Sequence, residues 1–305
     1  MSRTRKIAQI TALSATMFLF ASACSPQPVE EPVEETDASF TAGERPVNEQ
    51  VQQIHDALPE EIKERGSLNV AMSPGMAPLN YPDEASGDLI GFNPDIAHQL
   101  GEIMGLEVKL HAADNSQMLP GMEAGRYDIN VSNQAVTEER LEVVDFVEYY
   151  FSDSRLAVQA GNPNDLSVDN FCGMTIGVSI GSFQQTEVLP GRSDECEENG
   201  EEPITPESFP NQQDGIFALT SGRIDGLAGD GPVILYAVDQ ESGIEELGSL
   251  TSGSNLGIGV TKDSGLLDPV QMAMQELMDN GNYASTLDQY GMSDVSLDEA
   301  KVQTE

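Results

Sequence analysis

The sequence has no tryptophan, only 3 cysteines and 3 histidines, and few basic residues. Its 14 lysines and arginines stand against 52 aspartates and glutamates, so the formal net charge is −38 at pH 7. Such a negative surface repels phosphate backbones, which excludes nucleic acid as a partner. No CxxC, HExxH, GxGxxG or GxxxxGK[ST] pattern occurs. We therefore expect no metal site, no nucleotide and no cofactor.

The sequence does contain enough apolar residues for a folded body. Its 305 residues are 39% hydrophobic and 22% charged, which suits a sizeable core and about two domains. From residue 51 onward, helix and strand patterns alternate as in parallel α/β layers. The expected helices are 51–65 (broken around Pro59), 94–104, 116–124, 138–144, one from 183, 211–221 and 269–280. The expected strands are 67–72, 106–110, 127–132, 156–160, 175–180 and 224–228.

Residues 1–23 have the pattern of an export signal. A basic stretch over 3–6 precedes an apolar, uncharged run over 7–23. The run is short and polar for a membrane span, and it ends in small residues before Cys24. This ending resembles a bacterial lipobox, although Ala21 stands where an aliphatic residue is usual. We expect a lipid on Cys24, with a plainly secreted protein as the alternative.

Residues 24–50 are rich in proline and glutamate and have almost no apolar pattern, which predicts an acidic tether. A lipid on Cys24 would hold the body at the extracellular face of the cytoplasmic membrane. Cys172 and Cys196 then remain as a pair in a compartment where disulfides persist. These two cysteines can form a disulfide or remain as two free buried thiols, and the residues alone do not decide between the two.

One short motif occurs twice. Gly125-Arg-Tyr-Asp128 and Gly222-Arg-Ile-Asp225 each lie between an expected helix and an apolar strand. Glycine suits the left-handed position that ends a helix. The repeat favours one helix-to-strand turn used once in each of two lobes, with chance recurrence as the alternative.

Three positions carry groups that suit a free α-amino acid. Arg140 opposes the dipole of its helix, so either flanking glutamates offset it or it points at an anion such as a carboxylate. Ser182 and Gln185 resemble a capping box, and a helix start after a strand is a ready anion site. Asp230, after the strand at 224–228, is either a turn residue or a partner for an ammonium group.

Further short motifs stand in a characteristic order and spacing: Pro59-Glu-Glu-Ile-Lys63, Gly66-Ser-Leu-Asn-Val70, Ala77-Pro78, Gly91-Phe-Asn-Pro-Asp-Ile-Ala97, Thr137-Glu-Glu-Arg140, Val144-Asp-Phe146 and Gly173-Met-Thr-Ile-Gly-Val178. Through these motifs the chain resembles the family 3 extracellular solute-binding proteins, which are the polar amino-acid receptors of ABC importers. The resemblance extends from about Leu58 to Met292. Asn170-Phe-Cys-Gly173 with a later Cys196 resembles the actinobacterial branch, which implies a Cys172–Cys196 bridge.

The resemblance implies a two-lobe, periplasmic-binding-protein-like (type II) α/β fold with two crossover hinge segments. Lobe 1 is then 51–152 plus 253–295, lobe 2 is 156–249, and 296–305 is a C-terminal tail. The implied protein is a monomeric substrate-binding lipoprotein and no enzyme. It captures a polar amino acid and delivers it to the permease and ATPase subunits of an ABC importer.

The resemblance also implies roles for single residues. Arg140 matches the arginine that holds the ligand carboxylate, Ser182 and Phe183 the turn whose N–H groups assist it, and Asp230 the aspartate for the ammonium. Further ligand bonds are implied for Ser132, Asn133 and Ala135.

The side-chain pocket departs from the family pattern. Ser73 stands where receptors for basic amino acids have an aspartate, and Met76 and Asn115 replace a common aromatic pair. We therefore expect a neutral polar or uncommon amino acid rather than lysine, arginine or histidine.

Two rival functions use the same fold or a partial motif. A lyase of the cyclohexadienyl dehydratase type and a ligand-sensing module remain alternatives by resemblance. Gly177-Val-Ser-Ile-Gly181 satisfies the GxSxG pattern of hydrolases, but Ser179 falls within a strand. All three histidines precede Ser179, against the hydrolase order of serine, acid and histidine.

Overall fold

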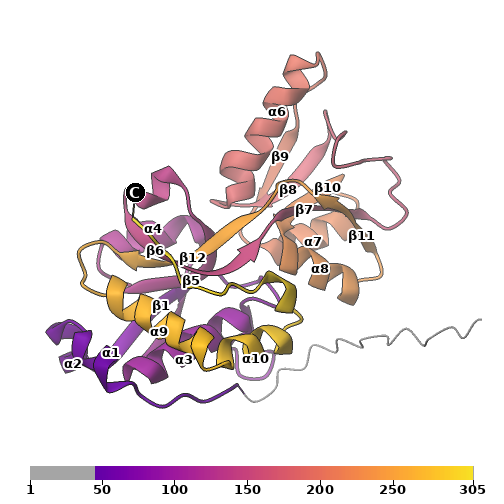
Figure 1. Ribbon diagram of the computed structural model, residues 1–305. Helices are drawn as coiled ribbons and strands as arrows, with labels where there is room; N and C mark the ends of the chain where they lie inside the picture. Colours follow the sequence, from indigo (N-terminus) through magenta and orange to yellow (C-terminus); the bar gives the residue numbers. More distant parts are fainter. Residues whose placement is uncertain (1–44, 305) are drawn as a thin grey trace, which may run out of the picture. The chain divides into compact units, whose positions relative to one another are not determined.

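The computed structural model describes residues 45–304, so the export signal, Cys24 and most of the tether lie outside the described residues. Helices and strands alternate along this part of the chain (Figure 1). The helices are α1 Gln52–Ala57, α2 Glu60–Arg65, α3 Phe92–Met104, α4 Asn115–Glu123, α5 Glu138–Leu141, the π-helical η1 Gln184–Val188, α6 Leu189–Glu198, α7 Gln212–Thr220, α8 Gly231–Gln240, α9 Leu267–Asp279, α10 Asn282–Gln289 and the 3₁₀ turn η2 Ser293–Val295.

The strands form two large sheets and a small one. The first large sheet has the order β13-β6-β12-β5-β1-β4, the second β11-β7-β10-β8-β9, and β2 pairs with β3. The strands are β1 Ser67–Met72, β2 Tyr81–Pro82, β3 Leu89–Ile90, β4 Glu107–Ala112, β5 Ile129–Ala135, β6 Val144–Ser152, β7 Ser154–Gln159, β8 Thr175–Ser179, β9 Thr205–Phe209, β10 Gly226–Asp230, β11 Ile244–Ser249, β12 Ser254–Thr261 and β13 Val302–Gln303.

Both large sheets are mixed, so the expectation of parallel layers is correct only for β5-β1-β4 in the first sheet and β10-β8-β9 in the second. β1 runs parallel to β4 and β5, and β8 runs parallel to β9 and β10. β12 is antiparallel to β5 and β6, and β7 is antiparallel to β10 and β11. The reason is that β7 and β12 enter their sheets from the crossovers, at the edge where the parallel strands end.

Two crossover segments join the sheets, as the type II fold requires. Asp153 alone separates β6 from β7, and residues 250–253 separate β11 from β12. The Ser154 N–H donates to Thr251 Oγ1 at 3.1 Å, and the Leu250 N–H donates to the Ser154 carbonyl at 2.6 Å. The two crossovers therefore run side by side.

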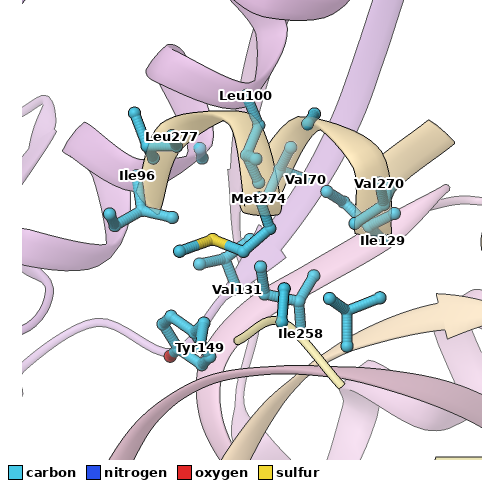
Figure 2. Packing of buried hydrophobic residues seen from close by; sticks show 14 of the residues in the cluster. Val70, Ile96, Leu100, Ile129, Val131, Tyr149, Ile258, Val270, Met274 and Leu277 are labelled. Carbon is cyan, nitrogen blue, oxygen red and sulfur yellow. The ribbon is translucent and has the colours of Figure 1, made fainter. Parts of the chain in front are cut away.

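An apolar cluster joins α3 and α9 to the first sheet. Ile96 and Leu100 of α3 and Met274 of α9 are fully buried. Figure 2 shows them beside Val131 of β5 and Ile258 of β12. Burying each such side chain stabilises the fold by about 1.5–3 kcal/mol, which fixes the strands whose carboxyl ends carry the site.

The repeated Gly-Arg-x-Asp motif forms the same turn in each sheet. Gly125 and Gly222 have left-handed φ angles of 68° and 71°. Asp128 Oδ2 accepts the Asn69 N–H at 2.7 Å, and Asp225 Oδ2 accepts the Thr175 N–H at 2.8 Å. Each aspartate thus fastens the start of a neighbouring strand, so the repeat reflects a shared structural role.

Both ends of the described chain pack closely on the first sheet and its helices. In the predicted tether, Arg45 Nη1 donates to Glu102 Oε1 at 2.6 Å, and the Asn48 N–H donates to Glu102 Oε2 at 2.9 Å. In the predicted tail, β13 pairs with β6 and Ala300 is buried. Residues 45–50 and 300–303 are therefore attached to the body rather than extended from it.

Two predicted helices differ in extent. The helix expected at 138–144 ends at Leu141, because Val144 already pairs in β6 with β12. The helix expected from 183 begins with the π-helical turn η1 before α6. Pro190 lies in the first turn of α6, where an α-helix needs no N–H donor, so α6 can begin directly after η1.

A disulfide joins Cys172 to Cys196, with an S–S distance of 1.99 Å and a Cα–Cα distance of 5.7 Å. The bridged positions are 24 residues apart in sequence. Closing a loop of this length stabilises a fold by about 3 kcal/mol in the chain-entropy model. The alternative of two free thiols is therefore wrong, and α6 is fastened to the segment before β8.

Candidate functional site

A small cavity lies where strands of both large sheets end. Its volume is about 40 Å³, enough for a few waters. Nine of the ten predicted ligand residues line it: Ser73, Met76, Asn115, Asn133, Ala135, Arg140, Ser182, Phe183 and Asp230. Carboxyl ends of parallel strands are where ligands bind in α/β sheets, so this cavity is the candidate site.

Ser132 is the predicted residue that does not line the cavity. Its hydroxyl oxygen accepts the Ser73 N–H at 3.0 Å, and the side chain is 1% exposed. This bond holds the residue after β1 against β5. In this arrangement Ser132 supports Ser73, which itself lines the cavity.

Arg140 is buried at the cavity between backbone carbonyls of the two sheets. Its Nη1 donates to the Ala135 carbonyl at 2.9 Å, and its Nη2 donates to the Gly181 carbonyl at 3.2 Å. A guanidinium has five N–H donors, so further donors remain for a ligand. None of the ion pairs among residues 45–304 includes Arg140.

The buried guanidinium is therefore a charge without a bonded counter-ion. Burial lowers the pKa of Arg140, while the negative charges of Asp230, Glu139 and Glu187 oppose that shift. The flanking glutamates thus act from a distance and form no ion pair with it. A buried cation of this kind gains most from an anion that brings its own hydrogen-bond acceptors.

Asp230 ends β10 and faces the same cavity. Its Oδ1 accepts a hydrogen bond from Gln184 Nε2 at 3.1 Å, and its Oδ2 accepts one from Asn133 Nδ2. Burial raises the pKa of Asp230 to about 6, although these two hydrogen bonds and Arg140 oppose the shift. The carboxylate is thus held in place but poorly solvated, which suits a partner with positive charge.

The turn after β8 begins the η1–α6 helix with the predicted capping bond. Gly181 has a φ of 72°, and Ser182 Oγ accepts the Gln185 N–H at 3.2 Å. Gln185 Oε1 in turn accepts the Gly181 N–H at 2.7 Å. These reciprocal bonds fix the carbonyl that Arg140 contacts.

Two buried polar atoms at the cavity have no hydrogen-bond partner among residues 45–304. They are Asn133 Oδ1, an acceptor beside Asp230, and Gln212 Nε2, a donor at the start of α7. Leaving such groups unpaired costs about 1–3 kcal/mol each. A ligand that supplies a donor to the first and an acceptor to the second removes that cost.

Several residues that line the cavity were not predicted from the sequence. They include Gln134, Asp153, Gln184, Gln212 and Thr251. Asp153 and Thr251 lie in the crossovers, whose positions no local pattern marks. Gln212 follows β9, a strand that the sequence did not reveal, so a strand prediction at 205–209 was the missing signal.

Residues 45–304 contain no group of three or more His, Cys, Asp or Glu side chains placed to hold a metal ion. Within the same residues no helix has the length and apolar character needed to cross a membrane.

The comparisons with known proteins agree with this geometry. The family profile of the bacterial extracellular solute-binding proteins, family 3, matches residues 68–293. The arginine-binding protein ArgT of Corynebacterium glutamicum is 30% identical over 299 residues, covering 98% of this chain and 95% of that protein. The chain therefore belongs to the family 3 extracellular solute-binding proteins.

Solved structures support the same assignment. An ancestral arginine-binding protein bound to arginine has a TM-score of 0.67 and 27% identity, covering 74% of this chain and 98% of that one. An ancestral arginine-binding protein bound to glutamine has a TM-score of 0.67 and 27% identity, covering 75% and 99% of the two chains. The predicted two-lobe type II fold is thus confirmed.

The raised pKa of Asp230 predicts a pH-dependent stability. The folded state holds this proton more tightly than the unfolded state, so the stabilisation is complete below pH 4 and is lost as pH rises through about 6. The free energy of unfolding of the ligand-free protein, compared with Asp230→Asn, should fall by up to about 3 kcal/mol across that window. Urea unfolding at several pH values measures it, and parallel curves for the two proteins would contradict it.

Proposed function

We propose that this chain is the substrate-binding lipoprotein of an ABC importer. It captures a polar amino acid between its two lobes and delivers it to the permease and ATPase subunits, acting as a monomer and without chemical conversion of the ligand. The relatives carry names of amino-acid binding proteins, which supports this class of ligand.

The observation that carries the proposal is the buried Arg140 without a bonded carboxylate, facing the same cavity as Asp230. A zwitterionic α-amino acid supplies both missing charges in one molecule. Its carboxylate fits Arg140 with the N–H groups of Ser182 and Phe183, and its ammonium fits Asp230 and the unpaired Asn133 Oδ1. Ala135, Ser73, Met76 and Asn115 complete the proposed ligand contacts, with Ser132 behind them.

Removing the guanidinium tests the proposal directly. Arg140→Ala should weaken the tightest-binding amino acid by about 30-fold to several thousand-fold, because truncating one partner of a buried charge pair costs about 2–5 kcal/mol. Calorimetry with the common L-amino acids is the assay, since the chain has 0 tryptophans to report by fluorescence. Arg126→Ala, at an exposed arginine, is the matched control. Folded Arg140→Ala that binds within threefold of wild type would overturn the proposal.

The proposal includes closure of lobe 1 (51–152 plus 253–295) on lobe 2 (156–249) about the crossovers. Arg140 donates to the Gly181 carbonyl and Asn133 donates to Asp230 across the cavity, so we expect a ligand to enter from a more open form in which these contacts are parted. Contacts between the lobes, such as Arg140 to the Gly181 carbonyl, then mark the closed side of the equilibrium.

Small-angle scattering tests this closure. A saturating amino acid should reduce the radius of gyration of the wild-type protein, because closure expels water from between the lobes. Arg140→Ala at the same ligand concentration should show no reduction. Identical scattering of free and calorimetrically saturated wild type would contradict the movement.

Membrane attachment rests on Cys24, which lies outside the described residues. The disulfide uses the two other cysteines, which leaves Cys24 as the thiol for lipidation. Cys24→Ser in the full chain should move the protein from the membrane fraction to the medium or the soluble fraction. Wild-type protein found wholly in the medium would favour the plainly secreted alternative.

A further inference from the structure

The charges that face the cavity are few and mostly committed. The charged lining residues are Arg140, Asp153 and Asp230. Asp153 is already bonded within the protein, because its Oδ1 accepts from Arg155 Nε at 3.1 Å and its Oδ2 accepts from the Ser249 hydroxyl, while Arg155 also pairs with Glu246. If Asp230 takes the ligand ammonium, no uncommitted carboxylate lines the cavity for a second positive charge.

The remaining cavity wall offers neutral amide groups. Asn115, Gln134, Gln184 and Gln212 line it together with several serines. Gln134 Nε2 donates to Asn115 Oδ1 at 2.8 Å, and Gln184 Nε2 donates to Ser154 Oγ and Asp230. Gln212 differs from these three, since its Nε2 is buried and has no partner among residues 45–304.

The Gln212 amide lies against the ends of β8 and β10. Ser179 Oγ, at the end of β8, donates to Gln212 Oε1 at 3.3 Å, and Gln212 is 5% exposed. A Cβ atom at Gly229 of β10 would lie 2.5 Å from Gln212 Nε2 and 2.8 Å from its Cδ. Glycine at 229 therefore leaves the space in which the amide lies. Serine and glycine from two strands thus hold an unpaired N–H donor at the cavity.

From these observations we infer that the ligand is an amino acid with an uncharged side chain bearing a hydrogen-bond acceptor, the carboxamide of L-glutamine being the class that fits. Gln212 Nε2 donates to that acceptor and selects against a cationic side chain. This inference rests on the proposed function, because it uses Arg140 and Asp230 for the two α-groups. It assigns to Gln212 a part in specificity that the family resemblance did not imply.

Calorimetry of the full chain with L-glutamine, L-arginine and L-norleucine tests the inference. Wild type should bind L-glutamine at least tenfold more tightly than either of the others, because norleucine lacks the acceptor and arginine brings an unpaired charge. Gln212→Glu should weaken L-glutamine by about tenfold and narrow or reverse its advantage over L-arginine. Gln212→Met, which removes the donor at similar volume, should weaken L-glutamine by a similar factor without favouring L-arginine.

The neighbouring Gln213→Glu is the matched control. Gln213 lines a different cleft from Gln212, so this variant adds the same negative charge one residue away without changing the cavity wall. It should leave the preference within twofold of wild type. Thermal unfolding checks that each variant is folded, and Gln212→Met carries the test if Gln212→Glu does not fold.

Two results would overturn the inference, and they differ in reach. If wild type prefers L-arginine, or if both folded Gln212 variants keep the wild-type preference while Arg140→Ala abolishes binding, the role of Gln212 is wrong and the proposed function stands. If none of the common L-amino acids binds wild type, both the inference and the proposed function fall.

Discussion

The site depends on one constraint, which is that Arg140 is buried and positively charged without a bonded carboxylate. Backbone carbonyls of Ala135, at the end of β5, and Gly181, in the turn after β8, accept hydrogen bonds from it. Carbonyl dipoles orient a guanidinium but replace only part of its lost hydration. The negative charge that favours the Arg140 cation most is that of Asp230. Asp230 is itself buried, and burial raises its pKa to about 6. The two charges attract each other without an ion pair, so the cavity between them favours a ligand that carries both opposite charges.

In the proposed closure, the two crossovers are the segments about which Arg140 and Asp230 move apart and together. Asp153 alone connects β6 to β7, and residues 250–253 return the chain to the first sheet. Their mutual hydrogen bonds leave a narrow, paired connection between two well-packed bodies. Bonds across the cavity in the described arrangement, such as Asn133 to Asp230, use polar groups that the proposed ligand would also contact. Ligand binding then exchanges bonds within the protein for bonds to the ligand.

Local patterns predicted the alternation of elements and three parts of the candidate site, which are Arg140, the Ser182 turn and Asp230. The Ser182–Gln185 capping bond, for example, is encoded within a few residues, and the structure contains it. The other candidate ligand residues came from the family resemblance, which alone implied the two crossovers. Local patterns missed the mixed sheets and β13, because these depend on pairing between distant segments. Gln212 was missed for the same reason. Its role follows from Ser179 and Gly229, which are neighbours only in the folded chain.

The arginine-binding relatives raise the question of which ligand side chain the cavity around Gln212 accepts. A family fold preserves the grip on the α-carboxylate and α-ammonium, since every amino acid carries them. Ser73, Met76 and Gln212, which line the cavity, are the residues proposed to face the ligand side chain, and none of them is a carboxylate. Asp153, the remaining acid there, is tied to Arg155. If the proposed contacts hold, a guanidinium or ammonium side chain loses its hydration without meeting an unbonded carboxylate, whereas an amide loses far less. Similarity of the whole chain to arginine-binding proteins therefore supports the fold and the proposed contacts to the α-carboxylate and α-ammonium groups more strongly than it supports arginine as the ligand.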